Sequence, residues 1–182
     1  MLILIFPIGL PGVGKSKLSL ELLEKLKQYK IFITCRDKLY QEAKRKGLSR
    51  SKTKKELEKE LDNFITMVKT YHQKNMNKKV IVYMDSNNIF KTVRDKIIFN
   101  INPNKIIYLN FIVSKENILL LYQRLQERKG HPTFPTNKED QERIVENISK
   151  GMEYEMEEEE KKIILNLSFT SNNNLDIVIE KI

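Results

Sequence analysis

The chain has 182 residues, 40% of them hydrophobic, which suits a globular protein with one domain over residues 1–182 and a sizeable core. No apolar run approaches the roughly 18 residues that a membrane-spanning helix needs, and the single cysteine, Cys35, excludes an internal disulfide framework. The 33 Lys and Arg residues exceed the 24 Asp and Glu residues, and the net charge of +9 favours a polyanionic partner such as RNA or DNA, the alternative being a merely lysine-rich surface. We expect an intracellular protein, cytoplasmic or nuclear, that is neither secreted nor bound to a membrane.

Short apolar runs alternate with longer polar stretches of helical character. Strands are predicted at 2–6, 31–34, 80–84, 105–113, 163–169 and 175–180. Helices are predicted at 15–28, 38–47, 53–74, 89–99, 115–128 and 138–160. This alternation predicts an α/β fold with a mainly parallel central sheet. Within the last helix, the tract "EYEMEEEE" is interpreted as a solvated helix face.

The first apolar run leads directly into "GLPGVGKS", which has the G-x-x-x-x-G-K-S spacing of a phosphate-binding loop. Its glycines let successive backbone N–H groups face one point at the start of the next helix. Lys15 is expected to reach the β- and γ-phosphates of ATP or GTP, and Ser16 to place its hydroxyl on Mg²⁺. The predicted nucleotide-binding residues are Gly9, Leu10, Pro11, Gly12, Val13, Gly14, Lys15, Ser16 and Lys17.

Two aspartates follow the next two strands, Asp37 after "KIFIT" and Asp85 after "VIVYM". In open α/β sheets a ligand binds outside the carboxyl ends of the strands, where both aspartates are expected. Phosphoryl transfer to an alcohol needs a carboxylate that accepts the hydroxyl proton. Either aspartate could be that base or act on the water shell of the metal, and for each the alternative is a helix N-cap or loop role.

After the strand at 105–113 comes "SKENILLLYQRLQERKGHPTF", in which Arg124 and Arg128 lie four residues apart on one helix face. The glycine and proline in "KGHPT" end this helix. Two arginines on a mobile lid at approximately 115–136 could stabilise charge on a transferring phosphoryl group, the alternative being ordinary surface arginines. By itself His131 is more typical of a loop residue than of a catalyst.

Taken together, these residues resemble the P-loop polynucleotide 5′-hydroxyl kinases. The phage-type enzymes carry G-x-P-G-x-G-K-S, a strand ending in R-D and a strand ending in D-x-N. Here the corresponding segments are "GLPGVGKS", "CRD" with Arg36 and Asp37, and "MDSNN" with Asp85 and Asn87. The phosphate loop alone is generic, but the whole series is much more specific.

The kinase domain of fungal-type tRNA ligases looks closer still over the second half of the chain. Its D-R-N-N-H segment is echoed by "DSNNIFKTVRD", and its L-N strand with R-x-x-x-R and a histidine loop is echoed by Arg124, Arg128 and His131. The order and spacing hold over roughly residues 1–135. Three departures concern acceptor recognition: Ser86 and Tyr40 stand where the relatives have arginine, and the lid loop is one residue shorter.

The resemblance implies a P-loop NTPase-type three-layer sandwich with a helical arginine-bearing lid. It implies a kinase that transfers the γ-phosphate of ATP or GTP to the 5′-hydroxyl end of RNA, or of DNA, in RNA repair or tRNA splicing. Asp37 would be the general base, and Lys15, Arg124 and Arg128 would hold the transferring phosphate. Ligase and phosphodiesterase domains could accompany this domain on a longer chain, as in the tRNA ligases.

The same resemblance implies where the metal and the acceptor bind. Ser16 would hold Mg²⁺, with Asp37 or Asp85 acting through water. The residues expected around the acceptor are Arg36, Asp85, Asn87, Asn88 and His131. Two other classes remain open: a small-molecule P-loop kinase acting on a nucleoside monophosphate or a sugar acid, and a nucleic-acid-stimulated NTPase.

Overall fold

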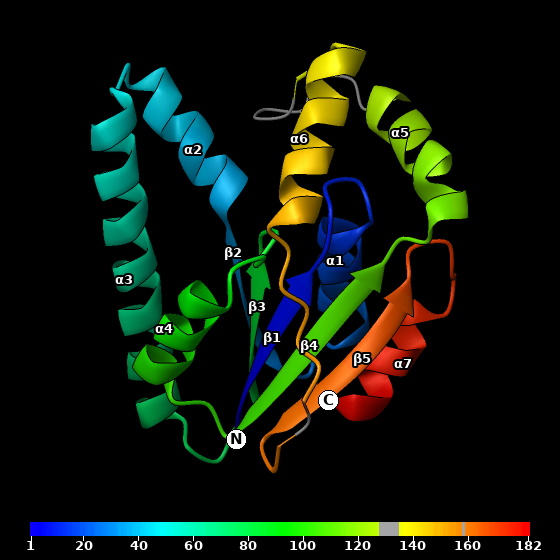
Figure 1. Ribbon diagram of the computed structural model, residues 1–182. Coiled ribbons are helices and arrows are strands. Elements are labelled where there is room, and N and C mark those ends of the chain that lie inside the picture. Colours follow the sequence, from blue (N-terminus) through cyan, green and yellow to red (C-terminus); the bar gives the residue numbers. More distant parts are fainter. Residues whose placement is uncertain (128–134, 158) are drawn as a thin grey trace.

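A parallel sheet of five strands forms the centre of the protein (Figure 1). The computed structural model describes residues 1–127, 135–157 and 159–182, without the side chains of residues 36–39, 44 and 50. The strands lie in the order β2-β3-β1-β4-β5, and each neighbouring pair is parallel. Their bounds are β1 Leu2–Ile8, β2 Lys30–Cys35, β3 Val80–Asp85, β4 Lys105–Ile112 and β5 Lys162–Ser168.

Helices cover both faces of this sheet and complete the expected three-layer α/β sandwich. One core includes Ile3 and Ile5 of β1 and side chains of α1, α5, α6 and α7, whereas the other includes Leu4 and Phe6 and side chains of α3 and α4. The helices are α1 Lys15–Lys25, α2 Arg36–Arg45, α3 Arg50–Lys74, α4 Lys91–Ile101, the 3₁₀ turn η1 Lys115–Asn117, α5 Ile118–Glu127, α6 Lys138–Lys150 and α7 Asn174–Lys181. Because both faces are covered, β1 is buried along its whole length, as its uniformly apolar sequence predicts.

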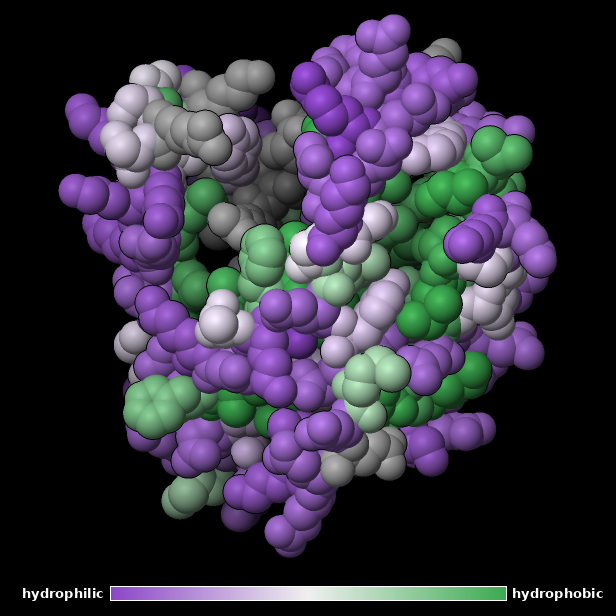
Figure 2. Space-filling model, viewed as in Figure 1, coloured by the Kyte–Doolittle hydropathy of each residue, from purple (hydrophilic) through white to green (hydrophobic). Residues whose placement is uncertain are grey.

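The surface in Figure 2 is hydrophilic over much of the outer helices, in keeping with the high content of charged residues. Across the described ranges, no helix combines the length and the apolarity that crossing a membrane requires.

The predicted strands at 2–6, 31–34, 80–84, 105–113 and 163–169 are confirmed, with ends shifted by one or two residues. The strand predicted at 175–180 is wrong, because this segment is helix α7. Leu175, Val178, Ile179 and Ile182 follow the helical spacing i, i+3, i+4, i+7 and belong to the core that also contains side chains of α1. The β-branched composition of the run favoured a strand, but the spacing of its apolar residues indicates the helix that forms.

The helix predicted at 138–160 is also wrong in its second half. Helix α6 ends at Lys150, and residues 151–157, here named the strap, cross the same face of the sheet as α4 (Figure 1). Met152 and Tyr154 of the strap pack on that core, and the Tyr154 hydroxyl donates to the Phe111 carbonyl at 3.0 Å. After the turn bonds of Gly151 and Met152 to the end of α6, β4 and the loop after β3 supply partners for the polar groups of the strap: the Glu153 N–H donates to the Ile89 carbonyl, and the Asn110 amide donates to the Glu155 carbonyl.

Candidate active site

The loop at residues 9–14 joins β1 to α1 and has a backbone that glycine adopts readily. Gly12 and Gly14 have φ angles of +90° and +101°, both in the left-handed region. A Cβ atom on Gly12 would lie 2.9 Å from Leu125 Cδ2 and 3.0 Å from Leu121 Cδ1, so α5 packs directly on the loop. The loop therefore packs against α5 at Gly12, and it ends at the N-terminus of α1, which favours bound anions.

Lys15, the first residue of α1, is turned back over this loop. Its ammonium group donates to the carbonyls of Gly9 at 2.9 Å and Leu10 at 2.7 Å, and the residue is only 7% exposed. The charge is thus held beside the loop backbone, where the phosphates bind in loops with this spacing.

Ser16 and Asp85 meet at the carboxyl ends of β1 and β3. The Ser16 hydroxyl donates to Asp85 Oδ1 at 2.9 Å. On the same strand as Asp85, the Tyr83 hydroxyl donates to the Lys15 carbonyl at 2.8 Å and fixes the start of α1. Burial, with a smaller contribution from the Asp85 carboxylate, raises the pKa of Tyr83 well above its usual value, so the phenol stays a neutral donor.

The turn after β3 is held by the side chain of Asn88, whose φ of +49° is left-handed. Its amide nitrogen donates to the carbonyls of Pro7 at 2.9 Å and Met84 at 2.7 Å, and its Oδ1 lies 2.6 Å from the Ser86 hydroxyl, which donates to it. Ser86, one of the departures from the related kinases, thus stabilises this turn. These bonds give Asn88 a structural role, and the acceptor contact predicted for it stays a prediction.

Asp37 lies at the same edge of the sheet as Asp85. Cys35, the last residue of β2, pairs with Asp85 in register, and α2 begins at the next residue, Arg36. The backbone therefore carries Asp37 only two residues beyond the register partner of Asp85. The side chains of Arg36 and Asp37 lie outside the described residues.

Arg124 of α5 is bound to the segment that follows β5. One of its Nη atoms donates to the Phe169 carbonyl at 3.1 Å, and its guanidinium lies 4.8 Å from the centre of the Phe169 ring. To hold a transferring phosphate, Arg124 would have to leave this partner. Arg128 and His131, and with them much of the predicted lid, lie outside the described residues.

Residues 1–112 match the family model described as "Chromatin associated protein KTI12". The chain belongs to the KTI12 family. No curated protein sequence matches it. The family match covers β1 to β4, including the phosphate loop and both aspartates, and leaves α5, α6, the strap and α7 outside it.

Several solved structures resemble this KTI12-family chain over nearly its whole length. A fungal RNA kinase has a TM-score of 0.64 at 16% identity, covering 98% of this chain and 84% of that one. Chaetomium thermophilum Kti12 in complex with ADP-AlF3 has a TM-score of 0.57 at 16% identity, covering 100% and 96%. Sinorhizobium meliloti gluconokinase has a TM-score of 0.52 at 14% identity, covering 98% and 87%. The KTI12-family chain therefore has the fold of P-loop kinases.

A buried charged network, not predicted from the sequence, lies behind the site of this KTI12-family chain. Arg94 is 1% exposed and Glu155 of the strap is 4% exposed, and their side chains approach to 3.4 Å. Arg94 also donates to the Asn88 carbonyl at 2.7 Å, and the carbonyl of Asn87 accepts from the N–H of Gly9 at 3.4 Å. The network thus connects the strap, through the turn after β3, to the phosphate loop.

Arg94 could have been identified from the sequence of α4. Together with Ile97 and Ile101 it occupies positions i, i+3 and i+7, which is the buried face of this helix. A charged residue on an apolar helix face needs a buried partner. Glu155, by contrast, lies in the acidic tract and gives no comparable local signal, so its interpretation as a solvated residue is wrong.

The arrangement of Ser16 and Asp85 fits the Mg²⁺ that accompanies a nucleoside triphosphate. Mg²⁺ keeps several waters and takes one or two protein oxygens in addition to phosphate oxygens. One hydroxyl and one carboxylate at 2.9 Å supply such a set. In the part of the chain that the structure describes, His, Cys, Asp and Glu form no group of three or more that could hold a metal without the nucleotide.

Proposed function

We propose that this KTI12-family protein is a kinase that transfers the γ-phosphate of ATP or GTP to the 5′-hydroxyl end of RNA. The observation that carries the proposal is the hydrogen bond from Ser16 to Asp85. It supports a role for Asp85 on the metal side of the site, and we propose Asp37, at the same edge of the sheet, as the carboxylate for the acceptor hydroxyl.

In this proposal each part of the phosphoryl transfer falls to named residues. Lys15 neutralises charge between the β- and γ-phosphates, and Asp37 accepts the proton of the attacking hydroxyl. Ser16 would hold Mg²⁺ and Asp85 would act on it through water, and the bound ion would supply positive charge against the phosphate oxygens. Arg124 supplies further positive charge if it exchanges Phe169 for the phosphate, and Arg128 is proposed to act beside it.

The choice of RNA as acceptor is supported by two observations. The net charge of +9 favours a polyanionic acceptor. A fungal RNA kinase is among the proteins with this fold, with a higher TM-score than the gluconokinase. A role in repair or splicing of RNA is part of the proposal, and the family's description as chromatin associated favours the nuclear location.

The gluconokinase among the similar structures supports a second candidate, a kinase for a small polar acceptor. A third candidate is hydrolysis of the nucleotide, in which water replaces the acceptor. The three candidate activities differ in the product that receives the γ-phosphate: RNA, a small acceptor or water.

The test offers γ-labelled ATP or GTP with Mg²⁺ to the protein and follows the label. The acceptors are a 5′-hydroxyl RNA oligomer, the same RNA with a 5′-phosphate, the matching DNA, gluconate and nucleoside monophosphates. We expect label on the 5′-hydroxyl RNA alone or on RNA and DNA, and none on the 5′-phosphate RNA. Label on a small acceptor, or only as inorganic phosphate, would contradict the proposal, and Lys15→Ala serves as the inactive control.

A further inference from the structure

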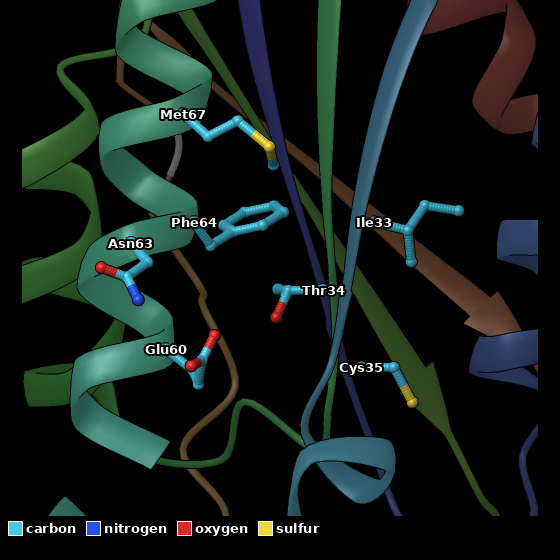
Figure 3. A pocket seen from close by; sticks show the side chains of 7 residues that line it. All are labelled: Ile33, Thr34, Cys35, Glu60, Asn63, Phe64 and Met67. Carbon is cyan, nitrogen blue, oxygen red and sulfur yellow. The ribbon is translucent and has the colours of Figure 1, made fainter. Parts of the chain in front are cut away.

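A cavity of about 280 Å³ lies between the carboxyl end of β2 and the face of α3 (Figure 3). Four residues of α3 line it at positions i, i+3, i+4 and i+7, which form one helix face: Glu60, Asn63, Phe64 and Met67. Ile33–Cys35 of β2 lines the opposite wall. In Figure 3, Phe64, Met67 and Glu60 point from α3 towards β2, and Thr34 points from β2 towards α3. Figure 2 shows the surface hollowed beside α3, with hydrophobic residues at the border of the opening.

The side chains in this cavity suit a flat ring with a polar edge. Phe64 offers an aromatic surface held in place by an edge-on contact with Phe32, whose ring centre lies 6.4 Å away. Met67 is 50% exposed, although it is apolar, and a thioether packs well against an aromatic ring. Thr34, Glu60 and Asn63 add a hydroxyl, a carboxylate and an amide to the apolar surfaces. Aromatic surfaces with nearby hydrogen-bonding groups are how proteins bind bases of single-stranded nucleic acids.

Charge and size favour a single uncharged ring over larger or anionic occupants. None of the described residues that line the cavity is a lysine or arginine, and Glu60 would repel a phosphate or a sugar acid. The volume lies at the lower end of the range for ligand pockets, so it accommodates one nucleoside and not several nucleotides.

The cavity is also next to the predicted catalytic base. Thr34 precedes Asp37 by three residues, which limits the distance between their Cα atoms to about 11 Å. Within one nucleotide, a single ribose separates the base from the 5′-hydroxyl. A base held in the cavity would therefore present its own 5′-hydroxyl to the end of the sheet where Asp37 lies.

We propose that this cavity binds the nucleobase of the 5′-terminal nucleotide of the acceptor. This inference rests on the proposed function, since it names the part of the RNA that the site recognises. The carboxylate of Glu60 can only accept hydrogen bonds, so it favours bases with an exocyclic amino group. Adenine, cytosine and guanine carry such a group, whereas uracil offers only its N3–H, placed between two carbonyls that the carboxylate repels, and is disfavoured.

The test compares four RNA oligomers that differ only in the 5′-terminal base and carry a 5′-hydroxyl. Initial transfer rates and direct binding, measured by fluorescence anisotropy of a 3′-labelled oligomer, are recorded for each. The variants are Met67→Ala and Glu60→Gln, and the matched controls are Met76→Ala and Glu58→Gln, which change exposed residues outside the cavity lining. Thermal unfolding confirms that each variant is folded.

We expect the wild type to favour amino-bearing bases over uracil, and Glu60→Gln to reduce this preference by about 5-fold or more. Met67→Ala should weaken binding of every oligomer by about 5-fold or more, since stacking does not depend on base identity. Both controls should match the wild type. Transfer that is insensitive to the 5′ base and to both variants would overturn the cavity assignment and leave the proposed function in place. Base-dependent binding that Met67→Ala weakens, without transfer to any RNA, would support the cavity and overturn the kinase activity.

Discussion

The buried pair of Arg94 and Glu155 predicts a large loss of stability on Arg94→Met. Methionine keeps the apolar stem of arginine but leaves the Glu155 carboxylate, 4% exposed, without its buried partner. Removing one member of a buried ion pair costs about 3–5 kcal/mol. Lys91 at 3.7 Å and Lys162 at 4.0 Å remain near Glu155, so we expect the lower part of this range, about 3 kcal/mol. For a chain of this size that loss corresponds to roughly 6–12 °C in Tm.

Lys91→Met is the matched control, because it removes a second cation from the same carboxylate. The Lys91 side chain is 54% exposed, so the loss should stay within about 1 kcal/mol. Urea unfolding at neutral pH, followed by circular dichroism, measures both free energies under the same conditions. Equal losses of unfolding free energy in the two variants would refute the view that burial, and not proximity to Glu155, determines how much each cation stabilises the protein.

Three further outcomes follow from the site. Gly12→Ala should weaken nucleotide binding, measured by titration with a fluorescent ATP analogue, because its φ of +90° is unfavourable for alanine and the new Cβ would lie 2.9 Å from Leu125. The control Gly47→Ala, with a φ of +65° and no atom within 4 Å of the new Cβ, should lose only stability, about 1–2 kcal/mol. Equal nucleotide affinities of the two variants would contradict this prediction. Burial raises the pKa of Tyr83 above the unfolded value of about 10, so its contribution to stability is present below that pH and is lost as the pH rises above it. Between pH 8 and 11, the free energy of unfolding measured in urea should therefore fall less in Tyr83→Phe than in the wild type. Identical pH profiles would exclude the effect. Arg124→Lys should slow single-turnover transfer nearly as much as Arg124→Ala, because lysine lacks the planar fork that binds phosphate oxygens in pairs, and full activity with lysine would make Arg124 a structural residue.

Local patterns predicted the sheet and the phosphate loop because the physical causes are local. Alternating apolar runs indicated all five strands, and the glycine spacing indicated the turn into α1. The same reasoning failed where a distant partner determines the structure. Glu155 follows Arg94 by 61 residues, so the sequence alone could not distinguish a buried carboxylate from its solvated neighbours in the acidic tract.

At the site, too, the sequence predicted which types of residue are present but not what each residue contacts. The sequence identified the polar residues after β3 but not the separate role of each one. In the structure, Asn88 stabilises the turn and Asp85 binds Ser16, two roles that depend on which backbone and side-chain groups the fold brings near. Phe64 and Met67 were not predicted to line a site, because their helical spacing is equally typical of a helix that packs on a core.

The two aspartates can be separated by the step at which each is needed. If Asp37 is the base, Asp37→Asn preserves the shape and removes the proton acceptor, so single-turnover transfer to a 5′-hydroxyl RNA should fall by about 10²–10⁴-fold. Nucleotide and Mg²⁺ should still bind, since Lys15 and the Ser16–Asp85 pair are unchanged. Asp85→Asn keeps a hydrogen-bonding partner for Ser16 but removes the charge beside the metal, so it should raise the Mg²⁺ concentration for half-maximal transfer and recover in part at saturation. Asp95→Asn, an exposed aspartate of α4, is the control and should behave as the wild type. Normal transfer in Asp37→Asn, with Asp85→Asn inactive at every Mg²⁺ concentration, would reverse the assignment and make the carboxylate of β3 the base.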